Sequence, residues 1–376
     1  MTRVPKILVD ARSVFRNVGG VGRAVLSTVR EMGHMGSARL IVLNNHPEHW
    51  RGMSGVEVLP YAPGPGETLE SRTWWEQVTL PHLVRHAGAD AVWSPWNWGV
   101  PWVSSVPSLL TVHDLIPYRR TNPMGSRFRS WLYRANLMQS LKKAHIVVCI
   151  SEFTRAEMLA AFPAYASKTN VIHWGVDRSF SPGQEQAVDG ELRLLYVGGK
   201  EPRKNVATLL HACAQASDSL RPVRIKLALT GRESQLDPAA TAARIQAGNR
   251  VRIEFLGEVE EERLIEQYRT SHVLVFPSLE EGFGFPPLEA QASGLPVICG
   301  TCDSIPEVVG EGAAFADVRD AAAMAKVIGR VACSSAERSD LRVRGLINAR
   351  RFDWSRCAHE YLQLLLKLAY SGRRIG

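Results

Sequence analysis

The sequence predicts an α/β protein made of two doubly wound domains, each with a parallel sheet. Its 376 residues exceed what one hydrophobic core usually serves, so two domains are expected. Short β-rich runs that are apolar on both faces alternate with helix-length segments, a pattern typical of buried parallel strands joined by crossover helices. A polar stretch containing glycine and proline, residues 175–190, separates six such units from six more.

Each predicted strand is a short apolar run. The six strands of the first half are expected at residues 6–11, 39–44, 91–95, 108–113, 146–151 and 169–174. Those of the second half are expected at residues 193–198, 224–231, 252–257, 273–278, 296–300 and 313–317. The predicted domains span residues 1–177 and 185–355, and a C-terminal helix, residues 356–376, is expected to pack back on the first domain. Because ligands bind at the carboxyl ends of parallel strands, we expect a site in a deep cleft where the two sheets face one another.

The composition is that of a soluble globular protein, with 45% hydrophobic and 22% charged residues. Asp10 and Arg12 lie where a signal peptide needs an unbroken apolar segment, and no apolar run approaches the ~18 residues of a membrane span. The six cysteines show no framework spacing, which favours a reducing cytoplasm. The sequence has no Asp-x-Asp pattern and no second cysteine pair beside Cys299 and Cys302, so we expect no metal and no cofactor.

The formal charge of +8 favours anionic partners such as nucleotides, diphosphate-linked substrates, phospholipid surfaces or nucleic acid. This charge is unevenly spread, because residues 115–151 contain no acid. They contain seven basic residues, Arg119, Arg120, Arg127, Arg129, Arg134, Lys142 and Lys143. Within residues 124–145 an apolar stripe follows helical spacing, formed by Phe128, Trp131, Leu132, Ala135, Met138 and Leu141. Such a helix lies either on an anionic membrane or against its own domain, and both interpretations stay open.

A glycine loop, residues 17–23, follows the first predicted strand and leads into a helix. It is neither a G-x-G-x-x-G fingerprint nor a P-loop. Gly19 and Gly20 permit close approach of the backbone to an anionic ligand at the helix N-terminus. A plain turn between strand and helix explains these glycines equally well.

A second loop, residues 198–205, has the same position in the other half of the chain. It begins at Gly198 and places Arg203 and Lys204 near a helix N-terminus, where the helix dipole disfavours cations. That placement indicates an anion between them, and a diphosphate fits, with the arginine binding two oxygens and the lysine acting as a point charge. A solvated charged turn is the alternative.

The third loop, EEGFGFPPLEA at residues 280–290, places Glu281 and Glu289 around two glycines, two phenylalanines and two prolines. The prolines predict the start of a helix, and we expect Glu289 in its first turn, where an acid complements the dipole. Glu281 precedes the helix and has no such explanation. The two acids are either the acid/base pair of a glycoside hydrolase or a pair of clamps for sugar hydroxyls.

The fourth loop, TVHDLIP at residues 111–117, follows a predicted strand of the first half. It contains His113 beside Asp114. A lone histidine is most often a buried structural residue, but this position at the edge of the predicted cleft favours a functional role.

These loops, taken in order, resemble the family 4 glycosyltransferases of GT-B fold, which move a sugar from a nucleotide diphosphate with retention at the anomeric carbon. The matching segments are the glycine loop at 19–22, TVHDL at 111–115, VGGKEPRKN at 197–205, PSLEEGFGFPPLEAQASGLPVI at 277–298 and SIPEVVGEGA at 304–313. They span nearly the whole chain, and the two glutamates around Gly-Phe-Gly are highly specific.

The resemblance implies the roles of the charged residues. Glu281 accepts hydrogen bonds from hydroxyls of the donor sugar, and Glu289 binds the ribose hydroxyls of the nucleotide. Arg203 and Lys204 neutralise the diphosphate, which removes the need for a metal. Fixed cations of this kind stabilise the charge that develops on the departing phosphate. His113 lies against the donor sugar near the reacting carbon.

The resemblance also implies backbone contacts to the donor. They come from Gly282, Phe283, Gly284 and Phe285 at the sugar and phosphate, from Leu256 and Gly257 at the nucleobase, from Gly198, and from Gly19 and Gly20 on the opposite domain. Together the loops look most like those of relatives that use GDP-mannose or a GDP-linked 6-deoxyhexose such as rhamnose. UDP-glucose-type donors stay open, because no side chain here reads the base with certainty.

The expected acceptor is a glycan linked to a polyprenyl diphosphate, in bacterial surface-glycan assembly. We expect a cytoplasmic protein with peripheral contact to the anionic inner membrane. Acceptor contacts are expected from Asp114, Trp96, Trp98 and Arg127, the tryptophans by stacking on sugars. Two competing hypotheses are a glycoside hydrolase, which leaves Arg203 and Lys204 unexplained, and a nucleic-acid-binding protein, which no recognition motif supports.

Overall fold

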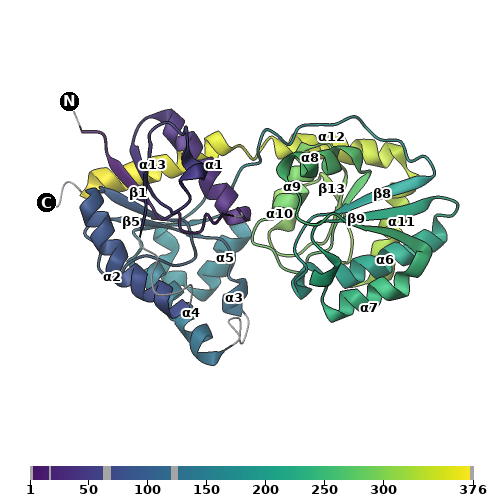
Figure 1. Ribbon diagram of the computed structural model, residues 1–376, viewed down its shortest axis with the longest axis horizontal. Coiled ribbons are helices and arrows are strands. Elements are labelled where there is room, and N and C mark those ends of the chain that lie inside the picture. The colour runs from purple at the N-terminus through teal and green to yellow at the C-terminus, as the bar shows by residue number, and fades with distance from the viewer. Residues whose placement is uncertain (1–2, 17, 62–68, 120–125, 373–376) are drawn as a thin grey trace. The chain divides into compact units, whose positions relative to one another are not determined.

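The chain divides into two compact units. The computed structural model describes residues 3–16, 18–61, 69–119 and 126–372 (Figure 1). Unit 1 comprises Met1–Gly175 and Asp353–Gly376, and unit 2 comprises Val176–Phe352. Four parts of the predicted features lie outside the described residues: Asn17 of the glycine loop, Arg120 of the acid-free segment, residues 124–125 before the basic helix, and residues 373–376 of the C-terminal helix.

Unit 1 is built on a seven-stranded parallel sheet with the order β3-β2-β1-β4-β5-β6-β7. Its strands are β1 (Lys6–Val9), β2 (Arg39–Leu43), β3 (Val56–Leu59), β4 (Ala91–Ser94), β5 (Ser108–Val112), β6 (Ile146–Cys149) and β7 (Thr169–Val171). The strand order reverses between β1 and β4, which pair in parallel. The loops after these two strands therefore border the switch point, where doubly wound sheets bind ligands.

The sequence predicts every strand of this sheet except β3. β3 is one of the two edge strands, and none of its residues is fully buried, since one side of it has no neighbouring strand. Glu57 interrupts its apolar residues and pairs with Arg39 of β2, with 2.9 Å between Oε2 and Nη2. A short strand with alternating polarity lacks the doubly apolar pattern by which the buried strands were predicted.

The helices of unit 1 are α1 (Gly20–Met35), α2 (Leu69–Ala87), α3 (Ile116–Arg119), α4 (Arg127–Lys143), α5 (Glu152–Ala161) and α13 (Trp354–Gly372), with short 3₁₀ helices at Pro47–Trp50 and Pro163–Lys168. α13 is the last helix of the chain and packs against α1 and β4. Its Tyr361 is fully buried, with its ring 4.8 Å from that of Trp93 and its hydroxyl 3.1 Å from Thr111 Oγ1. The C-terminal helix thus contributes to the core of unit 1.

Unit 2 is built on a six-stranded parallel sheet with the order β10-β9-β8-β11-β12-β13. Its strands are β8 (Glu191–Tyr196), β9 (Arg224–Leu229), β10 (Val251–Phe255), β11 (Val273–Phe276), β12 (Val297–Cys299) and β13 (Ala313–Phe315). All six lie within or beside the predicted runs. Here the strand order reverses between β8 and β11.

The helices of unit 2 are α6 (Val206–Ser219), α7 (Pro238–Ala247), α8 (Glu261–Thr270), α9 (Phe285–Ala292), α10 (Ile305–Val309), α11 (Ala321–Cys333) and α12 (Ser335–Ala349). Short 3₁₀ helices lie at Pro202–Lys204, Glu233–Gln235 and Gly248–Arg250. α6 packs with α7 and α11, and α9 packs with α10 and α12, with the sheet between these groups (Figure 1). Across the described ranges, no helix is both long and apolar enough to cross a membrane.

Candidate active site

In unit 2 the loops after β8 and β11 meet at the switch point of the sheet. The loop after β8 carries the 3₁₀ turn Pro202–Lys204, and the loop after β11 carries Glu281. A backbone hydrogen bond of 2.8 Å from Leu279 N to Arg203 O joins the two loops. Parallel strands end at the same edge of a sheet, so residues 77 positions apart become neighbours there.

Glu281 is the centre of this cluster. Its Oε1 accepts a hydrogen bond of 2.5 Å from Lys204 Nζ, and its Oε2 lies 3.7 Å from Arg203 Nη1. Its backbone is also held, because Glu281 N donates to Asp303 Oδ2 at 3.0 Å and Ser304 Oγ donates to Glu281 O at 3.0 Å. The carboxylate is therefore fixed in position by partners from two loops.

Arg203 and Lys204 lie close together, as the sequence predicts, but with different environments. The 3₁₀ turn holds both residues, and α6 itself begins two positions later at Val206. Lys204 is buried, whereas the Arg203 side chain is about a quarter exposed and donates to Glu280 O at 3.1 Å. Two cations therefore share the Glu281 carboxylate, with Arg203 closer to solvent.

The segment from Gly282 to Phe285 turns the chain from the sheet edge into α9. Gly284 has a φ of +103°, and a Cβ there would lie 2.5 Å from Ile305 Cδ1. Both the backbone conformation and the space therefore demand glycine. Phe283 is buried against Phe285, with 5.3 Å between ring centroids. The loop is rigidly packed at the N-terminus of α9, a position that favours negative charge.

Glu289 lies deeper than the sequence predicts. α9 begins at Phe285 and has no acid in its first turn, so the predicted first-turn position of Glu289 is wrong. Its side chain is 2% exposed, and its Oε2 accepts a 2.8 Å hydrogen bond from the Tyr268 hydroxyl of α8. The Tyr268 hydroxyl holds the Glu289 carboxylate in place. The sequence does not predict this role, because nothing near Tyr268 distinguishes it from a tyrosine of the hydrophobic core.

The loops after β9 and β10 complete this edge of the sheet. Gly257 and Gly231 exchange backbone hydrogen bonds of 2.7 and 3.2 Å, and Leu256 is buried beneath them. A Cβ on Gly257 would meet no atom within 4 Å among the described residues, so its backbone borders open space. Gly198, after β8, donates from its N to Thr230 Oγ1 at 3.1 Å.

Lys200 is a further cation at this edge, and it is not among the site residues predicted from the sequence. It follows Gly198 by two residues, is buried, and lies over the ring of Tyr196 with 4.6 Å from Nζ to the ring centroid. The signal that could have found it is the third cation in the segment Lys200–Lys204, one more than a turn of this length needs.

In unit 1 the glycine loop opens directly into α1. The helix begins at Gly20, and Gly19 is its N-cap with extended backbone and no side-chain cap. A Cβ on Gly19 would meet no described atom within 4 Å, and Gly19 itself is exposed. The first-turn amides of α1 therefore border open space. Both interpretations of this loop, a turn and an anion contact, fit that geometry.

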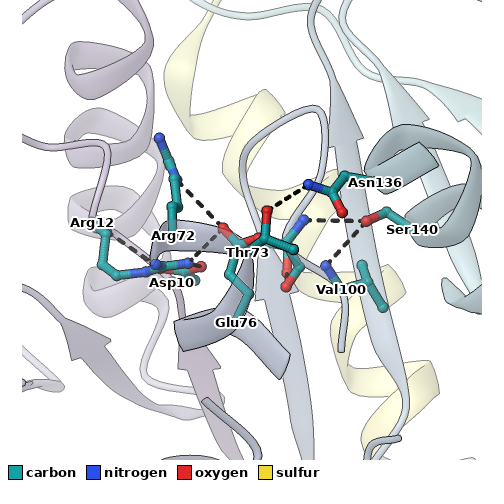
Figure 2. Close-up of polar contacts among 10 residues, drawn as sticks. Asp10, Arg12, Arg72, Thr73, Glu76, Val100, Asn136 and Ser140 are labelled. Atoms are coloured by element: carbon teal, nitrogen blue, oxygen red, sulfur yellow. Dashed lines mark hydrogen bonds and ion pairs between the residues drawn. The ribbon is translucent and has the colours of Figure 1, made fainter. Parts of the chain in front are cut away.

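A buried charge network that is not among the features predicted from the sequence follows β1 in unit 1 (Figure 2). Arg12 donates to both oxygens of Asp10 at 2.7 Å and to Glu76 Oε1 of α2 at 3.0 Å, and Arg72 donates to the same oxygen at 3.4 Å. Burial alone raises the pKa of Asp10, but Arg12 and Arg72 together outweigh burial and hold that pKa below its ordinary value. Burial raises the pKa of Glu76. The signal that could have found this network is Asp10-x-Arg12 directly after an apolar strand.

His113 follows β5 and is buried, with 6% of the residue exposed. Its Nε2 lies 3.0 Å from Pro95 O, and because a carbonyl only accepts, Nε2 carries the proton. Burial lowers the pKa of His113 to about 4, so the ring is neutral. Nδ1 is an acceptor with no hydrogen-bond partner among the described residues. The ring also packs 5.0 Å from the ring of Trp174.

The four residues expected to contact the acceptor differ in how deeply they are buried in unit 1. Asp114 Oδ1 accepts from Ile116 N at 3.0 Å at the start of α3. Trp98 belongs to the core and packs edge-on against Tyr133, with 5.1 Å between ring centroids. Trp96 is partly buried, with the Arg72 guanidinium 5.0 Å from its ring centroid. Arg127 is exposed as the first residue of α4.

Two family profiles match the chain, one in each unit. The family described as Glycosyltransferase Family 4 matches residues 18–180, and the family described as Glycosyl transferases group 1 matches residues 191–333. The chain belongs to the family 4 glycosyltransferases. The resemblance given by the loop motifs is thereby confirmed, and it rests on both halves of the chain.

Curated relatives of this glycosyltransferase include O-antigen chain mannosyltransferase B of Escherichia coli. The two are 31% identical over 232 residues, which cover 59% of this chain and 60% of that protein. The serotype-specific mannosyltransferase WbdA of Escherichia coli is 27% identical over 293 residues, which cover 73% of this chain and 34% of that protein. The chain thus spans about 60% and about a third of the length of these two relatives.

Solved structures share the whole architecture. Sucrose-phosphate synthase from Thermosynechococcus elongatus aligns with a TM-score of 0.76 over 98% of this chain and 100% of that chain, at 21% identity. HepE of Anabaena in complex with UDP and glucose aligns with a TM-score of 0.72 over 97% of this chain and 100% of that chain, at 17% identity. At these identities the likeness shows the fold, and it confirms the predicted GT-B class.

Proposed function

We propose that this glycosyltransferase moves mannose or a 6-deoxyhexose such as rhamnose from a GDP-sugar to a lipid-linked glycan, with retention and without a metal. The observation that carries the proposal is the convergence of Lys204 and Arg203 on Glu281 at the switch point of unit 2. The choice of sugar is supported by the mannosyltransferase names of the two Escherichia coli relatives. Such a protein acts in the cytoplasm, at the inner membrane, in the synthesis of a bacterial surface polysaccharide.

The proposed donor site separates charge along the nucleotide sugar. Lys204 and Arg203 stabilise the negative charge that develops on the departing diphosphate, together with the amides that begin α9. Because these donors are fixed before the substrate arrives, they need no reorganisation in the transition state. A metal ion is unnecessary in this arrangement.

The two glutamates bind the two ends of the donor in this proposal. Glu281 lies beside the diphosphate cations and accepts from hydroxyls of the donor sugar. Glu289, held by Tyr268, accepts from the ribose hydroxyls. Gly284 brings the backbone between them close to the breaking bond, and the open side of Gly257 receives the nucleobase.

His113 serves the proposed reaction as a neutral group. With Nε2–H committed to Pro95 O, the remaining Nδ1 can accept a hydrogen bond from a donor-sugar hydroxyl but cannot donate a proton. The acceptor's proton then passes to the leaving phosphate on the same face of the sugar, and no enzyme nucleophile is needed.

A glycoside hydrolase is the weaker hypothesis. A hydrolase needs one of the two carboxyl groups as a proton donor. Glu281 is engaged by Lys204 and Arg203, and Glu289 is engaged by Tyr268. Both carboxylates accept hydrogen bonds from these partners, as expected of groups that bind hydroxyls, so Glu281 and Glu289 do not resemble an acid/base pair.

The lipid-linked acceptor is supported by the surface of α4. The predicted apolar stripe is only partly correct, because of its six residues only Leu141 is buried. The buried residues of α4 are Ser130, Tyr133, Asn136, Leu137, Ser140 and Leu141. Phe128 and Trp131 lie outside the core, 60% and 61% exposed, with 6.1 Å between their ring centroids. Two exposed aromatic rings beside Arg127 and Arg129 fit the interface of an anionic membrane.

Vesicle flotation tests the membrane contact. The wild type should float with vesicles that contain anionic phospholipid, and a variant with Phe128→Ser and Trp131→Ser should not. Reversing the charges of Arg127 and Arg129 should also release the protein. Flotation that none of these changes affects would contradict the membrane contact.

A donor screen tests the proposed chemistry. GDP-mannose and GDP-rhamnose should raise the midpoint of thermal unfolding, whereas UDP-glucose should not. A UDP donor is the second candidate, because HepE, which shares the fold, was solved with UDP and glucose. Stabilisation by UDP-sugars alone would replace the GDP proposal by that candidate. Release of free sugar without acceptor, at the rate of transfer, would favour the hydrolase instead.

A further inference from the structure

Lys200 is a buried cation whose role the proposed reaction does not explain. It lies in the loop after β8, its side chain is 8% exposed, and its Nζ has no hydrogen-bond partner among the described residues. The nearby Lys204 is also buried, but its Nζ is bonded to Glu281. An ammonium group carries three donors, and burying it unpaired is costly, so proteins rarely retain one without a reason.

The surroundings of Lys200 show where its side chain points. Nζ lies over the ring of Tyr196 at the end of β8, at 4.6 Å from the centroid. Its Cε would lie 3.4 Å from a Cβ placed on Gly231, which follows β9 and is bonded to Gly257 after β10. The side chain therefore lies over the carboxyl ends of β8 and β9, beside Gly231.

Nearby groups offset little of the burial cost. The ring of Tyr196 provides a cation–π contact, and the one ionisable group that raises the affinity of Lys200 for its proton is Glu201. Glu201 is exposed, and burial outweighs it, so the pKa of Lys200 falls to about 8. On the side of β9, Gly231 is uncharged, and so is Gln235, whose Oε1 would lie 2.8 Å from a Cβ on Gly231. An incoming oxygen acceptor would restore the missing partner.

We infer that Lys200 binds an oxygen acceptor of the donor nucleotide, a phosphate oxygen of the diphosphate or a carbonyl oxygen of the nucleobase. The inference rests on the proposed donor site in unit 2. Lys200 would then be a third cation at the donor site, beside Arg203 and Lys204. Those two are paired with Glu281, whereas Lys200 can bind the nucleotide without breaking an existing ion pair. Lys200 is thus a specificity and affinity residue for the nucleotide.

Calorimetric titration of the full chain tests this role. The probes are GDP, GMP and guanosine, with UDP, UMP and uridine as a second series. Lys200→Met keeps the length of the side chain and removes its charge, and Lys326→Met removes an exposed lysine of α11 as the matched control. Replacing a charge-assisted hydrogen bond should weaken nucleotide binding about 10- to 100-fold, whereas the control should match the wild type.

The pattern of losses identifies the acceptor. A loss for GDP that is absent for guanosine assigns Lys200 to the diphosphate, and an equal loss for both assigns it to the nucleobase. The thermal midpoint of nucleotide-free Lys200→Met should equal or exceed that of the wild type, because the buried unpaired charge is gone. A variant that keeps its midpoint and binds all six probes within twofold of the wild type would overturn the inference.

The proposed function can fail separately. If the wild type binds neither nucleotide series, the donor site itself is wrong, and Lys200 loses its role with it. If the wild type binds GDP or UDP and Lys200→Met binds equally well, only the role of Lys200 is wrong.

Discussion

The two units carry polar groups at equivalent places, after the strands where each sheet reverses its order, yet they use charge in opposite ways. In unit 1, Asp10 and Glu76 are paired with Arg12 and Arg72 in a closed network (Figure 2). In unit 2, Lys204 and Arg203 share one carboxylate, and Lys200 has no partner among the described residues. A closed network stabilises a loop, whereas an excess of cations binds an anion. The difference assigns the nucleotide to unit 2 in the proposed function.

The largest effect is expected where the cations of unit 2 converge. Glu281→Ala should reduce kcat/KM for transfer by about 10²- to 10³-fold, because it removes a contact to the reacting donor sugar and the partner of Lys204. Steady-state transfer measurements check this, with Glu262→Ala, an exposed acid on α8, as the control. Near-native turnover of Glu281→Ala would contradict the donor-sugar role.

A comparable change in unit 1 should affect stability. Arg12→Met leaves Asp10 and Glu76 buried without their shared cation, so the free energy of unfolding should fall by about 3–5 kcal/mol. Urea denaturation of this variant and of Arg30→Met, which alters an exposed arginine on α1, measures the difference. If Arg12→Met unfolds like the wild type but has lost nucleotide binding, the contrast between the units is reversed.

A smaller effect follows from the pKa of Lys200, which burial lowers to about 8. The charged form binds the nucleotide and predominates below that pH, so affinity for GDP should be fully present at pH 7 and lost as the pH rises. Between pH 7 and pH 9 the dissociation constant should rise up to about tenfold, since GDP itself is already ionised there. Lys200→Met should show a flat profile over this range. A parallel rise in the variant would exclude Lys200 as the titrating group.

The last prediction is that the protonation of His113 does not change near neutral pH. Because burial lowers the pKa of His113 to about 4, the ring stays neutral between pH 5.5 and pH 8. The pH profile of kcat should therefore show no titration of His113 in that range, and His113→Gln should lose rate without changing the profile. A step near pH 6.5 that disappears in His113→Gln would contradict the neutral ring.

Features that follow from local sequence patterns could be predicted, whereas contacts between residues far apart in the sequence could not. The doubly apolar strands and the loops after them follow from local patterns, so the two sheets and the position of Glu281 were correctly expected. The edge strand β3 was not, because Glu57 breaks its pattern. The depth of Glu289 was also missed, because it depends on where α9 begins and on Tyr268, which lies 21 residues away.

The long-range ion pairs of both units could not be predicted from local patterns, because their partners are far apart in the sequence. Arg12 meets Glu76 across 64 residues, and Lys204 meets Glu281 across 77, so only the folded sheets bring them together. Lys200 illustrates the opposite case. Its sequence position was visible, but its lack of a partner is a property of the fold alone.

Hydrogen–deuterium exchange with and without GDP tests the central claim, that unit 2 holds the donor nucleotide. GDP should protect backbone amides of residues 198–205 and 281–289, while amides beside the closed network, at residues 10–12 and 72–76, should be unchanged. Protection confined to unit 1, with none in the loops after β8 and β11, would contradict the account.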